Sequence, residues 1–452
     1  MTDGFHAKRS RCPLWRGAIA FFILSICCVA VLTATAGIPQ SAIRRNMLQS
    51  AEFLCEGELF GDAIDGIAGS RIDRYADSIL LGIVWQYDPE DRLGSVMRSA
   101  YYHVPYQNEN ENLLAAVTEG KAANQQYLRY WHGSIAVVRP LLTVMSLEEI
   151  YRFNGIVLIG SAMLLIIVLL RRHGYTPAAG LLAGMILTSA WFVPCSLEYT
   201  WMFLLMLIDS LIILGLAWMG KREWYGIAFL CFGMIANFFD FLTTETLTLT
   251  VPLLLVLWVE KRKEGIYPAV LEDRIRIQRK AEPVIIRALG AWGVGYAANW
   301  ILKWVLASWV LGENVSPYVA GHVAERIGMT GQGAVGSGRY LAGTLLRNVK
   351  CLFPIEYGMG GILAWIMLML GCLYLAFVYR KDGVDNRQVL RYAMIAAIPY
   401  VRYLILLNHS YLHYFFTYRA QFSTVLAVVM ILDELGVWET IRRVQRRGKK
   451  TG

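Results

Sequence analysis

The stretch "GAIAFFILSICCVAVLTATAG", residues 17–37, is an apolar run preceded by four basic residues, Lys8, Arg9, Arg11 and Arg16. About 20 apolar residues are enough for one helix to cross bilayer hydrocarbon. Basic flanks stay on the cytoplasmic side, so the run predicts an uncleaved anchor whose C-terminal end faces outward. The small residues of "ATAGIP" leave signal-peptide cleavage as an alternative. In both cases the residues that follow are exported.

The rest of the chain repeats this pattern. Of its 452 residues 56% are hydrophobic and only 17% are charged. Hydrocarbon offers the backbone no hydrogen-bond partners, so each apolar run must satisfy its own amides as a helix. The further runs lie at 151–170, 176–194, 199–219, 223–241, 244–259, 285–306, 360–379, 391–407 and 418–437. The sequence therefore predicts an all-α polytopic membrane protein with about ten transmembrane helices.

Charge orients these helices. Most of the 43 Lys and Arg residues lie in the N-terminal tail, in alternate loops and in the C-terminal tail, which places both termini in the cytoplasm of a cell-membrane protein. The net charge of +9 is spread beside apolar runs, so no nucleic-acid partner is predicted. Segments 134–146 and 340–356 are too short or too charged to cross and predict interfacial or re-entrant helices. The glycine-rich segment 328–338 predicts an outer loop.

The predicted organisation has five parts. They are a basic cytoplasmic N-terminus (1–16), a first transmembrane helix (17–37), an outer loop with catalytic-side and interfacial helices (38–150), a bundle of nine transmembrane helices (151–437) and a basic cytoplasmic tail (438–452).

Unusual polar residues fall on the outer side of this topology. Ionisable groups near hydrocarbon are costly, and they persist where they face a cavity or a partner. Several separate segments deliver them to one face, which predicts an outer site. The candidates are Asp77, Arg129, His132, Arg139, Glu198, Asp240, His409, His413 and Arg419.

This mixture of groups suits chemistry on a lipid phosphate. A phosphate is a good leaving group, so such an enzyme needs one carboxylate base and cations that hold the developing negative charge. Arginine grips phosphate oxygens with two parallel hydrogen bonds. His409 and His413 are four residues apart and can share a helix face, but no third ligand follows at a fixed spacing. No metal site is therefore predicted.

Five short stretches carry a resemblance to a known family. A long outer loop with "RYADSIL", then "RYWHG" and "VVRPLL", then "FFDFLTT", and finally "HSYLHYFFTYR" before the last span resemble bacterial GT-C type membrane glycosyltransferases. Such enzymes take a sugar from a polyprenyl-phosphate donor. The resemblance implies transfer of a sugar, on the outer face, to a cell-surface glycan, lipid or protein. Its partners are membrane lipids, the donor and the acceptor. The polyprenyl-phosphate-linked sugar is the donor substrate, and a divalent metal is left open without support from the sequence.

The resemblance also implies roles for residues. Asp77 would be the catalytic base, because the first outer loop supplies that carboxylate in the family. The family's adjacent acidic pair is absent, so Asp62, Asp65 and Asp73 compete with Asp77. The remaining candidates would contact the donor phosphate or the sugar, with Arg419 gripping the phosphate and His409 or His413 assisting.

Two other functions remain open at this stage. A transporter or flippase of lipid-linked sugars would also place charges in a cavity, but it should carry charges through the membrane depth. The charges within the apolar runs are few, chiefly Asp209, Lys303 and Arg402. A polysaccharide polymerase would have a similar topology and also an outer site.

Overall fold

The structure is a computed structural model that describes residues 14–266, 271–328, 338–352, 360–381 and 383–437. Within these ranges the chain is helical, without a β-strand and with two isolated bridges, Asp62 to Arg71 and Tyr101 to Gln125. The all-α prediction is therefore confirmed. Residues 1–13 of the predicted N-terminal tail (1–16), the predicted C-terminal tail (438–452) and residues 329–337 of the glycine-rich loop lie outside the described residues.

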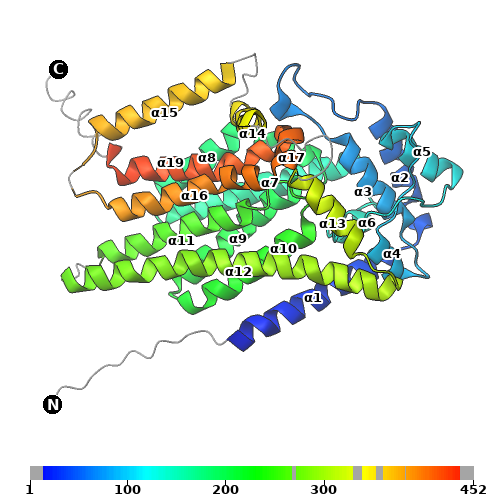
Figure 1. Cartoon of the computed structure of the whole chain (residues 1–452), viewed down its shortest axis with the longest axis horizontal. Helices are drawn as coiled ribbons and strands as arrows, with labels where there is room; N and C mark the ends of the chain where they lie inside the picture. Colours follow the sequence, from blue (N-terminus) through cyan, green and yellow to red (C-terminus); the bar gives the residue numbers. More distant parts are fainter. Residues whose placement is uncertain (1–13, 267–270, 329–337, 353–359, 382, 438–452) are drawn as a thin grey trace.

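A cap of short helices stands at one end of the molecule, on the right in Figure 1. Its sequence supplies the helix starts: Asp73 and Asp91 accept hydrogen bonds from the first turns of their helices, and Asn108 and Glu111 form a capping box. The cap helices are α2 (Gln40–Cys55), α3 (Arg74–Gln86), α4 (Arg92–Arg98), α5 (Glu109–Glu119) and α6 (Ile135–Leu141).

The longer helices lie side by side in a bundle next to the cap (Figure 1). Each predicted apolar run overlaps one of them, although several runs extend a few residues beyond the helix. They are α1 (Leu14–Ala36), α7 (Leu147–Arg171), α8 (Tyr175–Leu187), α9 (Thr200–Trp218), α10 (Tyr225–Phe239), α11 (Leu247–Ile266), α12 (Leu271–Leu311), α15 (Gly360–Val378), α16 (Asn386–Ile405) and α19 (Phe422–Glu434). The connecting helices near the cap are α13 (Ser316–Arg326), α14 (Gly338–Lys350), α17 (Leu407–Leu412) and α18 (Tyr414–Thr417).

Five helical stretches of the described chain are long and apolar enough to cross a membrane. They are Leu14–Ala36, Leu147–Arg171, Thr200–Trp218, Gly360–Val378 and Tyr414–Glu434. These helices indicate a membrane protein. The prediction of ten crossings is finer than this observation and stays a prediction.

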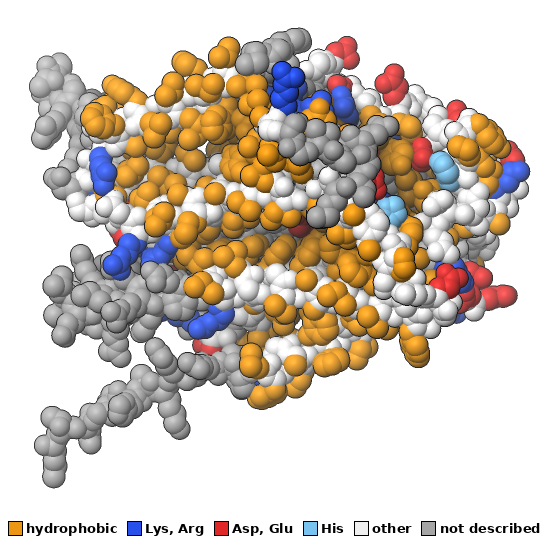
Figure 2. All heavy atoms as spheres, viewed as in Figure 1, with side chains coloured by type: hydrophobic (Ala, Val, Ile, Leu, Met, Phe, Trp, Pro, Cys, Tyr) orange, Lys and Arg blue, Asp and Glu red, His pale blue; other side chains and the backbone are white. Residues whose placement is uncertain are grey.

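The two ends of the molecule differ in charge. Figure 2 shows hydrophobic side chains over much of the bundle, with acidic side chains gathered on the cap and several Lys and Arg side chains at the opposite end. In Figure 1, α1 runs toward the cap, and α19 ends at the opposite end. The cap is therefore the polar end to which the bundle helices lead.

Buried polar contacts fix the cap to the bundle. The indole of Trp131 donates to the carbonyl oxygen of Asn299 at 2.9 Å, and the fully buried Lys303 ammonium donates to the carbonyl of Val96 at 3.0 Å. A Cβ on Gly133 would lie 2.4 Å from the ring of Phe238, so only glycine permits this approach of cap to α10. Contacts of this kind set the geometry of everything enclosed between the two parts.

Candidate functional site

A small cavity of about 70 Å³ lies where the cap meets the bundle, and we call it the junction cavity. Residues from α3, the loop before α6, the turn before α9, the end of α13, and α17 line it. Four of the predicted site residues meet here, namely His132, Glu198, His409 and His413. The other polar lining residues are Asp73, Tyr75, Tyr127 and Arg326.

Asp73 is a buried carboxylate held at the start of α3. One oxygen accepts from the amide of Ala76 at 2.9 Å, and the other accepts from the hydroxyl of Tyr199 at 2.8 Å. Burial raises the pKa of Asp73 to about 6, against the opposing effect of these hydrogen bonds. A carboxylate that is oriented by two donors and titrates near neutrality suits a general base.

Glu198 lies in the turn that leads into α9. No donor among the described residues contacts its carboxylate. Burial, followed by the negative charges of Asp73, Asp240 and Asp77, raises its pKa well above the usual range. Burial and the neighbouring negative charges thus favour the protonated form of Glu198, which can donate a hydrogen bond.

Arg326 supplies the positive charge of the cavity. Its Nη1 donates to Nδ1 of His409 at 3.0 Å and lies 3.4 Å from Nε2 of His413. Nε2 of His409 lies 2.8 Å from the carbonyl of Leu242, so its proton sits on that nitrogen and Nδ1 is free to accept. Both imidazoles are neutral, because burial and the neighbouring cation lower their pKa values, that of His413 to about 3.

The guanidinium of Arg326 keeps unused hydrogen-bonding capacity. Its Nε is buried and has no partner among the described residues. A buried donor without an acceptor is costly, so an anionic ligand at this point would satisfy it. The two neutral histidines hold the guanidinium in place without neutralising its charge.

His132 completes the polar lining with an unpaired nitrogen. The side chain is 1% exposed, and its Nε2 lies 2.9 Å from the carbonyl of Tyr127, which fixes the proton on Nε2. Burial lowers the pKa of His132 to about 3, so the ring is neutral. Its Nδ1 is buried without a partner and is therefore an acceptor available to a ligand hydroxyl.

Asp77 lies one turn further along α3 and does not line the junction cavity. Its carboxylate accepts from the hydroxyl of Tyr151 and from the amide of Leu197, at 3.0 and 3.1 Å to its two oxygens. Ser196 adds a longer contact of 3.4 Å. These bonds join the cap to α7 and to the turn before α9, so the structure gives Asp77 a bracing position.

Two of the predicted site residues, Arg139 and Arg419, donate hydrogen bonds to backbone carbonyls. Arg139 is fully buried and donates to the carbonyls of Val84, Ile38 and Tyr87. Arg419 is 1% exposed and donates to the carbonyl of Gly69 at 2.8 Å. Neither lines the junction cavity.

Asp240 and Arg129 also lie outside the lining. Asp240 accepts from the amides of Leu242 and Thr243 at 2.8 and 2.9 Å and from the hydroxyl of Tyr296 at 3.0 Å, so it shapes the turn after α10. Arg129 packs 4.1 Å from the centre of the Tyr127 ring. Arg129 therefore contacts Tyr127, which lines the junction cavity, but does not line the cavity itself.

Sequence reasoning missed Arg326 and ranked Asp73 only as a competitor. Arg326 ends α13 in a stretch, "VAERIG", that has no distinguishing charge pattern. Asp73 carried one local signal, because an Asp directly before a helical run is a typical N-cap. That signal indicates a structural position and gives no hint of a cavity.

The arrangement therefore combines an oriented base, a second carboxyl group, a cation with spare donors and an unpaired acceptor. Among the described residues, no group of three His, Cys, Asp or Glu side chains is placed to hold a metal ion. Comparisons with protein-family models, with curated proteins and with solved structures found no match.

Proposed function

We propose that this protein is a membrane glycosyltransferase that moves a sugar from a polyprenyl-phosphate donor to an acceptor hydroxyl at the cap end of the bundle. The observation that carries the proposal is the junction cavity, where Asp73 and Glu198 share one enclosed space with Arg326. Carboxylate base and phosphate-binding cation are the two components that displacement of a lipid phosphate requires.

In the proposed reaction the acceptor oxygen attacks the anomeric carbon of the sugar while Asp73 takes the hydroxyl proton. The bond between that carbon and the phosphate oxygen breaks, and polyprenyl phosphate leaves with the electron pair. The guanidinium of Arg326 stabilises the charge that develops on the phosphate. Nδ1 of His132 accepts from a sugar hydroxyl, and the protonated Glu198 donates to another oxygen of the sugar or acceptor.

The location of the cavity supports a lipid-linked donor. Its lining residues come from elements at the cap end of the bundle, and a donor phosphate bound there would leave the lipid tail beside the bundle helices. The volume of about 70 Å³ is too small for a whole sugar, so the cavity has to enlarge when the donor binds.

The proposal includes the ten-span topology with both termini in the cytoplasm. Thiol labelling of intact cells tests it, in a background without native cysteines. Cysteines introduced within 105–120 should react with a membrane-impermeant reagent, and those within 265–280 should not. The opposite pattern would invert the cap and place the cavity on the wrong face.

Activity is tested with purified protein in proteoliposomes, supplied with polyprenyl-phosphate-linked radiolabelled sugars. Expected results are label in a new product and release of polyprenyl phosphate. A double variant, Asp73→Asn with Glu198→Gln, should lose transfer and keep the wild-type melting temperature. Movement of the intact donor across the bilayer without a new product would instead identify a transporter and reject the proposal.

A further inference from the structure

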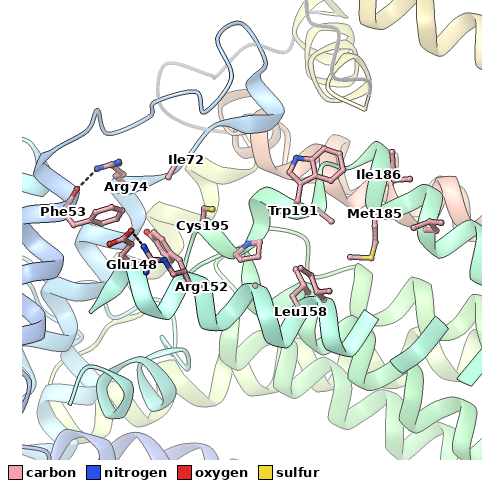
Figure 3. A pocket seen from close by; sticks show the side chains of 16 residues that line it. Phe53, Ile72, Arg74, Glu148, Arg152, Leu158, Met185, Ile186, Trp191 and Cys195 are labelled. Carbon is pink, nitrogen blue, oxygen red and sulfur yellow. Dashed lines mark hydrogen bonds and ion pairs between the residues drawn. The ribbon is translucent and has the colours of Figure 1, made fainter. Parts of the chain in front are cut away.

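A second and larger hollow lies on the side of the molecule, against α7 and α8, and we call it the lateral groove. Its volume is about 580 Å³. Figure 3 shows Leu158, Met185, Ile186 and Trp191 along its length. Three charged residues, Arg74, Glu148 and Arg152, lie together at the end of the groove that is away from Met185 and Trp191 (Figure 3). The lateral groove is therefore amphiphilic from end to end.

The polarity of the lateral groove follows the membrane axis. α7 is one of the helices that can cross a membrane, and Glu148 and Arg152 lie in its first two turns, beside the cap. The apolar part runs along the next turns, where Ile159 is 58% exposed and Leu182 of α8 is 53% exposed. The groove thus opens sideways to hydrocarbon, with its charged end at headgroup depth.

The charges at that end favour an anion. Arg152 pairs with Glu148 at 2.5 Å, so these two nearly cancel. Arg74 donates only to carbonyl oxygens, those of Phe53 at 2.7 Å and Leu54 at 3.1 Å. No carboxylate among the described residues pairs with Arg74, which leaves one positive charge for a headgroup. A membrane lipid with an anionic headgroup has the shape and the charge that fit.

One short segment separates the lateral groove from the junction cavity. Ile72 and Arg74 line the groove, whereas Asp73 and Tyr75, between and beside them, line the cavity. The proposed base therefore belongs to the wall that the two hollows share. Arg326 and the two histidines enter the cavity from other elements, α13 and α17.

We infer that the lateral groove binds the acceptor, and that the acceptor is a membrane lipid with an anionic headgroup. The inference rests on the proposed function, since a base must contact the hydroxyl that it deprotonates. Asp73 faces the junction cavity from the segment whose neighbours Ile72 and Arg74 line the groove, so the acceptor headgroup must reach past this segment to bring its hydroxyl to the base. The donor phosphate is assigned to Arg326. Two lipids then enter from different sides, and the sugar passes between their headgroups.

Photocrosslinking tests occupancy of the groove without any turnover. The protein is placed in nanodiscs that contain either phosphatidylglycerol or phosphatidylcholine with a diazirine in the acyl chain. Adducts should form on Met185 and Trp191, several times more with the anionic lipid. Equal labelling by the two lipids, or adducts spread evenly over exposed helices such as α15, would overturn the site.

A matched pair of variants tests the role. Gly155 lines the groove, and a Cβ there would meet only Pro194 at ordinary contact distance, so Gly155→Trp fills the groove without a backbone clash. Its neighbour Ile156 is 72% exposed and does not line the groove, so Ile156→Trp is the control. Gly155→Trp should abolish the adducts and lower sugar transfer about tenfold or more, and Ile156→Trp should do neither.

The outcomes separate the two proposals. Transfer is measured in proteoliposomes of total polar lipid from the source membrane, as donor-derived label in a lipid product. If Gly155→Trp abolishes the adducts but transfer continues, the acceptor does not occupy the groove, and this inference fails while the proposed function stands. If adducts form but no donor supports transfer, the proposed function fails and the acceptor role fails with it.

Discussion

Asp73 and Asp77 are two carboxylates one turn apart on the same helix, and the structure places them in different surroundings. Both are buried, at 3% and 0% exposure, and burial raises both pKa values, to about 6 and about 7. Asp73 lines a cavity, whereas Asp77 is enclosed by Tyr151 and Leu197.

The comparison shows that a perturbed pKa does not by itself distinguish a reactive group from a bracing group. Burial is the main cause at both positions. What differs is access: a substrate in the junction cavity can approach Asp73, but Asp77 is surrounded by protein. The two aspartates therefore form a matched pair for mutagenesis.

The largest expected effect is on turnover. Asp73→Asn removes the proton acceptor but keeps an amide oxygen for the N-cap, so turnover should fall roughly 100-fold or more with little loss of stability. Asp77→Asn should change turnover by less than about fivefold, because Asp77 does not face the cavity. Initial rates with radiolabelled donor, together with melting temperatures, measure both.

A large loss in Asp77→Asn with normal melting, beside near-normal turnover in Asp73→Asn, would reverse these assignments. The base would then be Asp77, as the sequence resemblance implies. Asp73→Glu is a useful third variant, because it keeps the charge and should retain part of the activity.

The next largest effect is on donor binding, and it compares two arginines that differ in their access to the junction cavity. The Nε of each arginine is buried without a partner among the described residues, but only Arg326 lines the junction cavity, whereas Arg419 lies outside it and donates to the carbonyl of Gly69. Arg326→Lys keeps the charge but loses the planar fork, so it should weaken donor binding by about 1 to 3 kcal/mol, seen as a higher KM for the donor. Arg419→Lys should lower the melting temperature and leave that KM nearly unchanged.

The reverse result has a clear meaning as well. A raised donor KM in Arg419→Lys at normal melting temperature would return the phosphate to Arg419. It would also remove the main cation from the proposed mechanism.

The smallest expected effect is the pH dependence of stability. Because the folded-state pKa of Asp77 is raised from 3.8 to about 7, the folded protein holds a proton that the unfolded chain releases between these values. Stability should therefore fall as pH rises from about 4 to about 7. Asp77→Asn should flatten part of this slope, leaving the part due to Asp73 and Glu198.

Melting temperatures of wild type and variant in one detergent, at half-unit pH steps, measure this difference. Parallel curves would show that Asp77 does not bind its proton more tightly in the folded state. In that case the contrast with Asp73 would rest on access alone.

Much of the fold was predictable, because apolar runs in a membrane protein must form helices. The sequence predicted nine polar residues at one face, and four of them, His132, Glu198, His409 and His413, line the junction cavity. The sequence does not distinguish Asp73 from Asp77, because the partners of Asp77 lie 74 and 120 residues away. Arg326 gave no signal, since its role depends on how α13 packs against α17.

The buried bonds between cap and bundle also constrain the order of events during synthesis. The hydrogen bond from Trp131 needs Asn299, which is synthesised 168 residues later. The carbonyl of Val96 accepts from Lys303, which is synthesised 207 residues later. At ribosomal rates that delay is on the order of ten to forty seconds. Throughout this interval the cap lacks these contacts, and the carbonyl groups that accept from Lys303 stay unpaired until α12 has been made.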